Sequence, residues 1–169
     1  MEEVSLQEML AAREHRVALQ TRLLQQYKKS LISFTLNIPG PVKVPDGVPQ
    51  AFATGCRRIE ALLKDRLVLV QHMETIKEKT GYEAFYCIDA NPEFIKTLMV
   101  TLEDQDRLGR LFDIDVIRPD GSKVSREELG RPSRTCLLCK EPAHACSRSR
   151  RHSVAELTAE IGHILKDLY

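Results

Sequence analysis

The sequence has no apolar run that approaches the roughly 18 residues a membrane-spanning helix requires. It begins Met1-Glu2-Glu3, which is acidic where a secretory signal is basic, and no apolar segment follows. Internal repeats and low-complexity tracts are absent too. Hydrophobic residues make up 43% of the chain and the formal net charge is only +1, which argues against disorder and against a general nucleic-acid-coating surface. We therefore expect a cytoplasmic protein whose partners include neither membrane nor nucleic acid.

A chain of 169 residues fits one domain, 1–169, which buries about two-thirds of its unfolded surface and needs no disulfide bridges. The five cysteines are an odd number, and in a reducing cytoplasm we expect thiols or metal ligands rather than bridges. Cys56 and Cys87 lie in apolar segments, where a small buried side chain is the expected role.

Positive charge is concentrated late in the chain. From Arg118 to His152 there are nine Lys and Arg residues against four Asp and Glu residues, a local excess of +5 that leaves −4 for the remainder. This excess fits a solvated basic surface. It fits equally a site for a polyanion, either a phosphorylated small molecule or an acidic partner protein.

Local patterns predict an α+β fold with a mixed sheet flanked by helices and long helices at both ends of the chain. Ser5 with Glu8, and Ser153 with Glu156, match the capping box that opens a helix. They begin a helix over 5–29 and a terminal helix after residue 153. We also expect helices over 49–65 and from 92, strands over 31–37, 67–70, 82–88, 97–103 and 111–118, a hairpin turn near 80–81 and a loop over 131–151.

Residues 109–116, with the sequence GRLFDIDV, carry the most informative chemistry. Successive side chains of a strand point to opposite faces, so Phe112, Ile114 and Val116 are expected to be buried while Asp113 and Asp115 share the other face. Two residues of strand separate these carboxylates by about 6.6 Å along the chain. Two like charges this close are costly unless a cation lies between them, and hard oxygen ligands suit Mg²⁺ bound to a phosphorylated substrate.

Neighbouring residues favour a phosphate site. Gly109 permits close approach of the backbone, and the guanidinium of Arg110 can bind phosphate with two parallel hydrogen bonds. Apolar and polar residues alternate over 97–103, which predicts a strand whose polar face presents Glu103 as a third carboxylate for the metal. The alternative for Asp113 and Asp115 is a solvent-facing strand edge with two acids, because D-x-D is a short motif.

The cysteines at the end of the chain have metal-ligand spacing. Cys136, Cys139, Cys146 and His152 offer three thiolates and an imidazole, a set that suits tetrahedral zinc, with His144 as a competing fourth ligand. Four filled positions leave none for water, so we expect such a zinc to be structural. The alternative is three reduced cysteines without a metal.

On these residues the chain resembles the apo-citrate lyase phosphoribosyl-dephospho-CoA transferase (CitX) family. The resemblance covers nearly the whole chain and is weakest over 66–91. Its motifs are Arg13-x-x-Arg16-x-x-x-Gln20, Ser33-Phe34-Thr35, Pro39-Gly40-Pro41-Val42-Lys43, the segment 108–116, Ser125-Arg126, Arg134, and the cysteine cluster with His152.

The resemblance implies a nucleotidyltransferase-like core and a defined reaction. Such an enzyme takes triphosphoribosyl-dephospho-CoA, joins its phosphoribosyl end to a serine of the apo-acyl-carrier subunit of citrate lyase, and releases diphosphate. Mg²⁺ on Asp113 and Asp115 is expected to align the triphosphate, with Arg110 beside the developing charge. The expected substrate-binding residues are Gly109, Gly40, Lys43, Arg126, Arg134, Arg13 and Arg16.

Two other interpretations stay open. A zinc-stabilised, non-enzymatic binding module would dock its basic late segment onto an acidic protein or nucleic acid, but it gives the two aspartates no role. An analogous transferase that serves the carrier protein of malonate decarboxylase would use similar chemistry. For each basic residue the ordinary alternative is an exposed salt bridge, worth about 0–1 kcal/mol.

Overall fold

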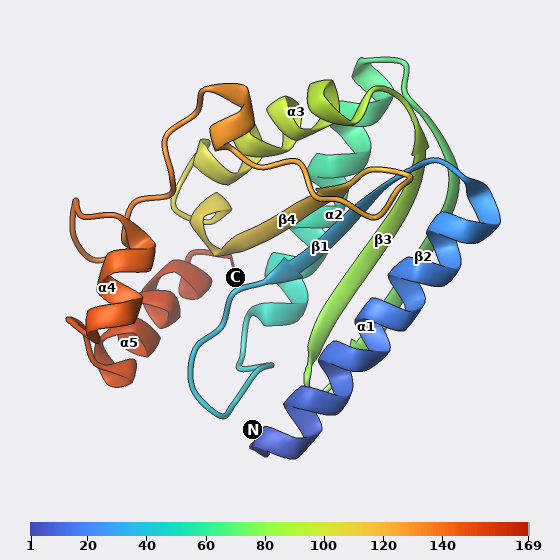
Figure 1. Ribbon diagram of the computed structural model, residues 1–169. Helices are drawn as coiled ribbons and strands as arrows, with labels where there is room; N and C mark the ends of the chain where they lie inside the picture. Colours follow the sequence, from blue (N-terminus) through green and yellow to red (C-terminus); the bar gives the residue numbers. More distant parts are fainter. Residues whose placement is uncertain (169) are drawn as a thin grey trace.

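The computed structural model describes residues 1–168, which form a four-stranded sheet with helices on both faces (Figure 1). The α-helices and strands in chain order are α1 (Leu6–Tyr27), β1 (Ser30–Leu36), α2 (Val48–Asp65), β2 (Leu69–Glu78), β3 (Gly81–Asp89), α3 (Pro92–Asp104), β4 (Phe112–Ile117), α4 (Ala143–Ser149) and α5 (Val154–Lys166). Two single-turn 3₁₀ helices, η1 (Gly109–Leu111) and η2 (Glu127–Leu129), precede and follow β4.

The strands stand in the order β2-β3-β1-β4, and each neighbouring pair is antiparallel. The predicted α+β class is confirmed, but the sheet is antiparallel and not mixed. A tight turn at Gly81, whose φ of 133° favours glycine, reverses the chain between β2 and β3. β4 lies at one edge of the sheet, beside β1. The nucleotidyltransferase-like core stays a prediction.

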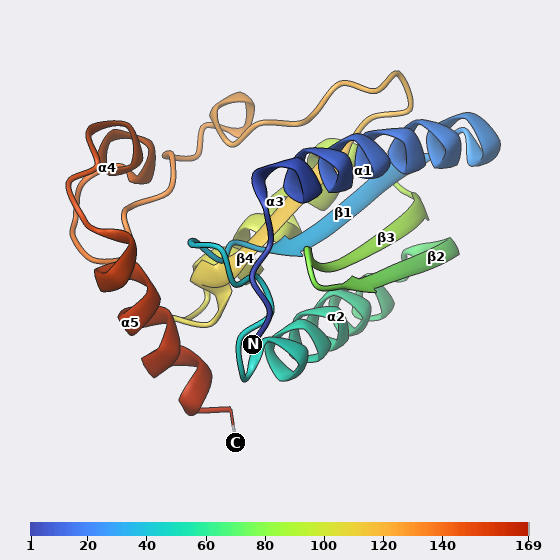
Figure 2. The same ribbon diagram turned by 90° about the horizontal axis from the view of Figure 1, so that it is seen from below.

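Helices cover the sheet in two layers, with α1 on one face and α2 and α3 on the other (Figure 2). The larger hydrophobic core lies on the α2–α3 face and includes Phe34, Tyr86 and Phe112. Helix α5 contributes Ile161 and Ile164 to this core from one end of the molecule. The sheet is therefore anchored mainly through one face.

The face under α1 is apolar over only part of its area. A small cluster joins Leu23 and Leu24 of α1 to Leu31, Phe85, Cys87 and Ile117 of the sheet. The part of α1 before Leu19 contributes nothing to this cluster, and its apolar residues Leu6, Leu10 and Val17 are exposed. The apolar residues in this part of α1 therefore do not form a stripe that packs against the sheet. The rest of the sheet face under α1 is polar, and it carries the candidate site.

The strand predicted over 97–103 is wrong, because these residues continue α3. The side chain of Asn91 accepts a hydrogen bond from the amide of Phe94 at 2.9 Å, which caps the helix. Leu98 and Leu102, with the buried Ile95 and Met99, complete an i, i+3, i+4, i+7 stripe. The alternation that suggested a strand is a by-product of this broad buried face.

The remaining predictions differ mainly in extent. Both capping boxes are present. The hairpin is confirmed, although its first strand runs to Glu78, and the loop expected over 131–151 contains α4. Cys56 and Cys87 are buried thiols. Among the helices of residues 1–168, none is both long and apolar enough to cross a membrane.

Two helical glycines give a matched test of the packing between α2 and the sheet. A Cβ atom at Gly55 would clash with the ring of Phe34, whereas a Cβ atom at Gly162 of α5 would meet no atom within 4 Å. Gly55→Ala is expected to lower the free energy of unfolding by about 1–3 kcal/mol. Gly162→Ala is expected to raise it by up to about 1 kcal/mol. Urea unfolding of both variants measures this, and a Gly55→Ala protein as stable as the parent would contradict the packing.

Candidate active site

The two faces of β4 differ completely in polarity. Phe112, Ile114 and Val116 are fully buried against the larger core. Asp113 is exposed and Asp115 is partly exposed, and strand alternation places both on the face toward α1. The expected division of this segment into a buried apolar face and an acidic face is therefore present in the fold.

The acidic face continues across the sheet onto β1 and β3. Thr35 of β1 lies opposite Asp113 on one side and opposite Glu83 of β3 on the other. Glu83 is buried, with 5% of its surface exposed, and forms an ion pair with Arg16 of α1. Sequence reasoning missed Glu83. Glu83, Phe85 and Cys87 are alternate residues of β3, so the sequence could have placed Glu83 on the same sheet face as the other two. Its position beside Thr35 depends on the pairing of β1 with β3, which the sequence does not show.

Helix α1 lies over this face of the sheet (Figure 2), and two of its polar side chains contact the strands. The side-chain amide of Gln20 donates a hydrogen bond of 3.0 Å to the hydroxyl of Ser33, which lies opposite Asp115 in the sheet. One turn earlier, Arg16 reaches Glu83. Arg16 and Gln20 of the Arg13-x-x-Arg16-x-x-x-Gln20 motif therefore contact β3 and β1 on the sheet face that carries the aspartates.

Two further basic groups lie near the start of α1. The Lys43 ammonium donates a hydrogen bond of 2.8 Å to the carbonyl oxygen of Ile38, and partial burial together with the Arg13 guanidinium lowers the pKa of Lys43. Among residues 1–168, Arg13 forms no ion pair or hydrogen bond through its side chain. Gly40, with a φ of 82°, turns the connection that carries Lys43. Two neighbouring cations without an acidic partner suit an anion between them.

The surroundings of Asp113 disfavour its charged form. Desolvation by the surrounding protein, followed by the carboxylates of Asp115 and Glu103, raises the pKa of Asp113. Asp115 accepts a hydrogen bond of 3.1 Å from the Lys123 ammonium. The pair is therefore electrostatically unfavourable for Asp113 as it stands, and a bound cation would relieve this.

Glu103 lies elsewhere than expected, because the strand on which its predicted metal role depended is a helix. It is 2% exposed at the end of α3, where one carboxylate oxygen accepts the amide of Ile114 at 2.9 Å. The other oxygen accepts a hydrogen bond of 2.7 Å from Arg126. Both carboxylate oxygens of Glu103 already have partners at the edge of β4, which favours a structural role over the expected role as a magnesium ligand.

Two other charged side chains complete this edge of β4. The Lys96 ammonium donates to the carbonyl oxygen of Ile114 at 2.9 Å. The Arg134 guanidinium donates to the carbonyl oxygens of Phe112 at 2.7 Å and Arg110 at 2.8 Å. Side chains therefore satisfy backbone groups that a further strand would otherwise pair.

Arg126 and Arg134, both expected to bind substrate, are engaged within the protein. Arg126 is 9% exposed and also contacts Asp104 at 3.2 Å, and Glu103 and Asp104 raise the pKa of its guanidinium against the effect of burial. Arg134 also lies 3.7 Å from Glu103. The positions of these two arginines favour a structural role over direct contact with phosphate.

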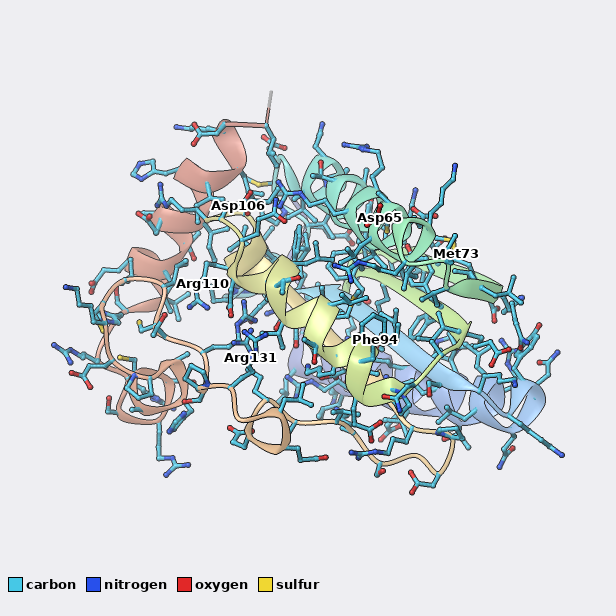
Figure 3. The ribbon with its side chains drawn as sticks, turned by 90° about the horizontal axis from the view of Figure 1, so that it is seen from above. Asp65, Met73, Phe94, Asp106, Arg110 and Arg131 are labelled. Atoms are coloured by element: carbon cyan, nitrogen blue, oxygen red, sulfur yellow. The ribbon has the colours of Figure 1, made fainter. Side chains whose placement is uncertain are left out.

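Gly109 and Arg110 form the turn that leads into β4. A Cβ atom at Gly109 would clash with the carbonyl oxygen of Leu102, so glycine is needed for η1 to pack against α3. Arg110 lies between the end of α3 and the segment that leads to α4 (Figure 3). Its guanidinium is half-buried and lines a cavity of about 610 Å³, and burial followed by the charge of Arg134 lowers its pKa.

The cysteine cluster is assembled as the spacing predicts. The ligand atoms of Cys136, Cys139, Cys146 and His152 all lie within 4.8 Å of one another. The Cys139 and Cys146 sulfurs are 3.4 Å apart, and the Nε2 atom of His152 is 3.4 Å from the Cys139 sulfur. Sulfurs around a tetrahedral zinc lie about 3.8 Å apart, because each Zn–S bond is about 2.3 Å. The donor set and its dimensions therefore fit zinc.

An acidic pair on one strand, with basic groups on the facing helix and in the adjoining turn, is an arrangement suited to phosphoryl-transfer enzymes. The comparisons with known proteins point to one such class. The model of the family described as apo-citrate lyase phosphoribosyl-dephospho-CoA transferase matches residues 4–168. The chain belongs to this family of transferases.

Similar curated proteins carry the same description. The chain is 39% identical over 165 residues to a probable apo-citrate lyase phosphoribosyl-dephospho-CoA transferase of Vibrio cholerae, which covers 97% of this chain and 93% of the relative. It is 36% identical to a Streptococcus pyogenes protein named in the same way, over 99% of this chain and 88% of the relative. An Escherichia coli apo-citrate lyase phosphoribosyl-dephospho-CoA transferase is 33% identical, over 98% and 90%.

The role of Glu103 can be tested by removing its charge alone. Glu103→Gln leaves Arg126 buried with only Asp104 to balance it, and is expected to lower the free energy of unfolding by about 3 kcal/mol. Asp104→Asn, one residue away and half exposed, is expected to cost less than about 1 kcal/mol. Denaturant unfolding compares the two, and equal losses would show that the burial of Glu103 is unimportant.

Proposed function

We propose that this chain transfers the phosphoribosyl-dephospho-CoA group from triphosphoribosyl-dephospho-CoA to a serine of the acyl-carrier protein of citrate lyase. Family membership supports the reaction, and the placement of Asp113 and Asp115 on one face of β4 is the observation that ties it to this site. The acceptor and the group transferred follow the description shared by the family and its relatives.

The reaction exchanges a phosphoanhydride bond of the triphosphate for a phosphodiester bond to the carrier serine. The carrier serine oxygen attacks the phosphorus nearest the ribose, forming a P–O bond while the bond from that phosphorus to the bridging oxygen breaks. Diphosphate leaves with the electron pair of the broken bond, and the serine proton passes to solvent or to a group at the site. Negative charge grows on the leaving diphosphate, so cations placed there stabilise the transition state more than the bound substrate.

Asp113 and Asp115 would hold Mg²⁺. The fit rests on two carboxylates of one strand face, and desolvation by the surrounding protein together with the charge of Asp115 raises the pKa of Asp113. When bound, Mg²⁺ would supply a positive charge that offsets the negative charge of the triphosphate. Glu83 takes no part in this set, because it is engaged by Arg16.

The cations that would bind the triphosphate are Lys43 and Arg13 near the start of α1, whereas Arg110, in the turn before β4, lines the adjoining cavity. Arg16 would act by orienting Glu83 and the polar surface around Thr35. Gly109 and Gly40 would act by allowing the turns that carry Arg110 and Lys43.

Cys136, Cys139, Cys146 and His152 would hold a structural zinc ion. Besides the distances between the ligand atoms, the amide of Leu138 donates to the Cys136 sulfur at 3.4 Å, a bond that supports a thiolate. The Nδ1 atom of His152 lies 3.8 Å from the Glu156 carboxylate, which would orient the ring for ligation through Nε2.

The direct test is incubation of the protein with triphosphoribosyl-dephospho-CoA, Mg²⁺ and the apo-carrier protein of citrate lyase. We expect a mass gain on the carrier serine together with release of one diphosphate per carrier. Equal or faster modification of the carrier protein of malonate decarboxylase would reassign the acceptor. Binding of the carrier without mass gain or diphosphate would instead support a non-enzymatic binding module.

The metal role of Asp113 predicts opposite effects on activity and stability. Asp113→Asn is expected to slow diphosphate release by about 100-fold or more. A carboxyl group whose pKa is raised in the folded protein destabilises the fold as pH rises from the unfolded value of about 3.9 through the raised value. Asp113→Asn should therefore raise the unfolding free energy at neutral pH without Mg²⁺ and leave it unchanged below both values.

Activity assays and urea unfolding at several pH values check this prediction. Asp89→Asn is a matched control, because Asp89 is an exposed aspartate at the end of β3. An Asp113→Asn protein that releases diphosphate at the parental rate would remove the metal role.

Zinc binding predicts one zinc ion per chain in protein purified without chelators. Cys139→Ser is expected to lose this zinc, because it removes a thiolate from the centre of the cluster. Cys56→Ala should retain it, because Cys56 is buried in the main core. Elemental analysis decides the matter, and a parental protein without zinc would refute the site.

A further inference from the structure

A cavity of about 610 Å³ adjoins the candidate site without including either aspartate. It lies at the end of the sheet where β1 finishes and β4 begins, with Asn37, Arg110 and Leu111 on one side. Arg150, Leu157 and Ile161 of the C-terminal segment line the other side. We propose that this cavity binds the adenosine diphosphate portion of the dephospho-CoA group, an inference that rests on the proposed transfer.

The arginine side chains in the cavity lining favour an anionic ligand. Arg110 is half-buried, yet among residues 1–168 its guanidinium forms no ion pair or hydrogen bond. Arg134 also lines the cavity, but its terminal nitrogens donate to backbone oxygens and it lies 3.7 Å from Glu103, so its charge is already balanced. Arg150, at the C-terminal end of α4, adds a second available cation to the lining. A diphosphate is an anion that can accept hydrogen bonds from Arg110 on one wall and Arg150 on the other.

The remaining lining suits a nucleobase. The side chains of Leu111, Leu137, Leu157 and Ile161 give the cavity apolar walls between its arginines. A volume near 600 Å³ falls within the range of about 300–1,000 Å³ that is usual for small-molecule sites. A flat, weakly polar adenine ring fits such walls, and its attached diphosphate fits the cationic rim.

The position of the cavity matches the connectivity of the substrate. Leu111 lines the cavity and Asp113 follows two residues later, a step of about 6.6 Å along an extended chain. The backbone N–H of Asn37 donates a hydrogen bond of 2.8 Å to the carbonyl oxygen of Leu111, so the end of β1 is joined to the start of β4 beside the cavity. A ligand whose adenosine diphosphate occupies the cavity therefore has its triphosphate-bearing ribose within reach of the acidic face of β4.

The experiment is titration calorimetry of the full chain with ADP and with dephospho-CoA, in the absence of Mg²⁺ and carrier protein. Both ligands are expected to bind. Arg110→Gln should raise the dissociation constants about tenfold, because it removes a charge-assisted hydrogen bond from a partly buried site. Circular dichroism establishes that each variant is folded.

Matched variants separate the cavity from general charge effects. Arg150→Gln should weaken binding of ADP, whereas Arg148→Gln removes the same charge from α4 outside the cavity lining and should not. Ser147→Trp places a large side chain in the cavity and should abolish binding, while Ser149→Trp on the same helix should leave it intact. Asp113→Asn should bind dephospho-CoA normally.

The outcomes distinguish this inference from the proposed reaction. Carrier modification by the parental protein, with no ADP or dephospho-CoA binding at 1 mM ligand (about 4 kcal/mol in binding free energy), would overturn the cavity assignment alone. Nucleotide binding that depends on Arg110 and is blocked by Ser147→Trp, without any carrier modification, would keep the cavity and overturn the reaction. Binding that is insensitive to both variants would place the nucleotide elsewhere.

Discussion

The buried carboxylate of Glu103 joins its own helix, α3, to three other parts of the molecule: strand β4 and the segments that carry Arg126 and Arg134. It accepts the amide of Ile114 on β4 and the guanidinium of Arg126 beyond it, and it lies 3.7 Å from Arg134. Without this carboxylate, a buried amide would lack its acceptor and two arginines would lose the anion that balances them. Either loss costs several times the contribution of an exposed ion pair.

This constraint determines how β4 presents its aspartates. An edge strand has one row of unpaired backbone groups and is free to fray or to pair with another chain. Here Lys96, Glu103 and Arg134 occupy that row, while Phe112 and Ile114 lock the buried face. The opposite face is thereby held rigid, and it turns its carboxylates toward α1. A metal site benefits from this rigidity, because its ligands need a fixed separation.

Sequence patterns predicted the parts of this arrangement that depend on local physics. Strand alternation identified which side of residues 112–116 is buried, and cysteine spacing identified a cluster that the fold assembles. Patterns failed where the outcome depended on distant partners. The alternation over 97–103 concealed a helix, and Glu83 became visible only once β1 had been paired with β3. Nothing local indicated that Arg126 and Arg134 would turn inward, because that depends on which backbone groups β4 leaves unpaired.

Because Arg126 and Arg134 point into the protein, fewer basic residues after residue 117 are free to bind an anion than the net charge of this segment suggests. Arg126 and Arg134 balance buried acids and carbonyl groups, and Arg118 pairs with Glu93 and Glu128. Of the five basic residues of this segment for which no ion pair is found within residues 1–168, three lie on α4 or at its C-terminal end, namely Arg148, Arg150 and Arg151. A helix of seven residues has little stability of its own, so its position depends on the contacts that flank it. The cysteine cluster brackets this helix, and Cys136, Cys146 and His152 line the same cavity as Arg150. A metal held there would fix one wall of the cavity relative to Arg110, which gives a structural zinc ion a direct consequence for the binding of anions.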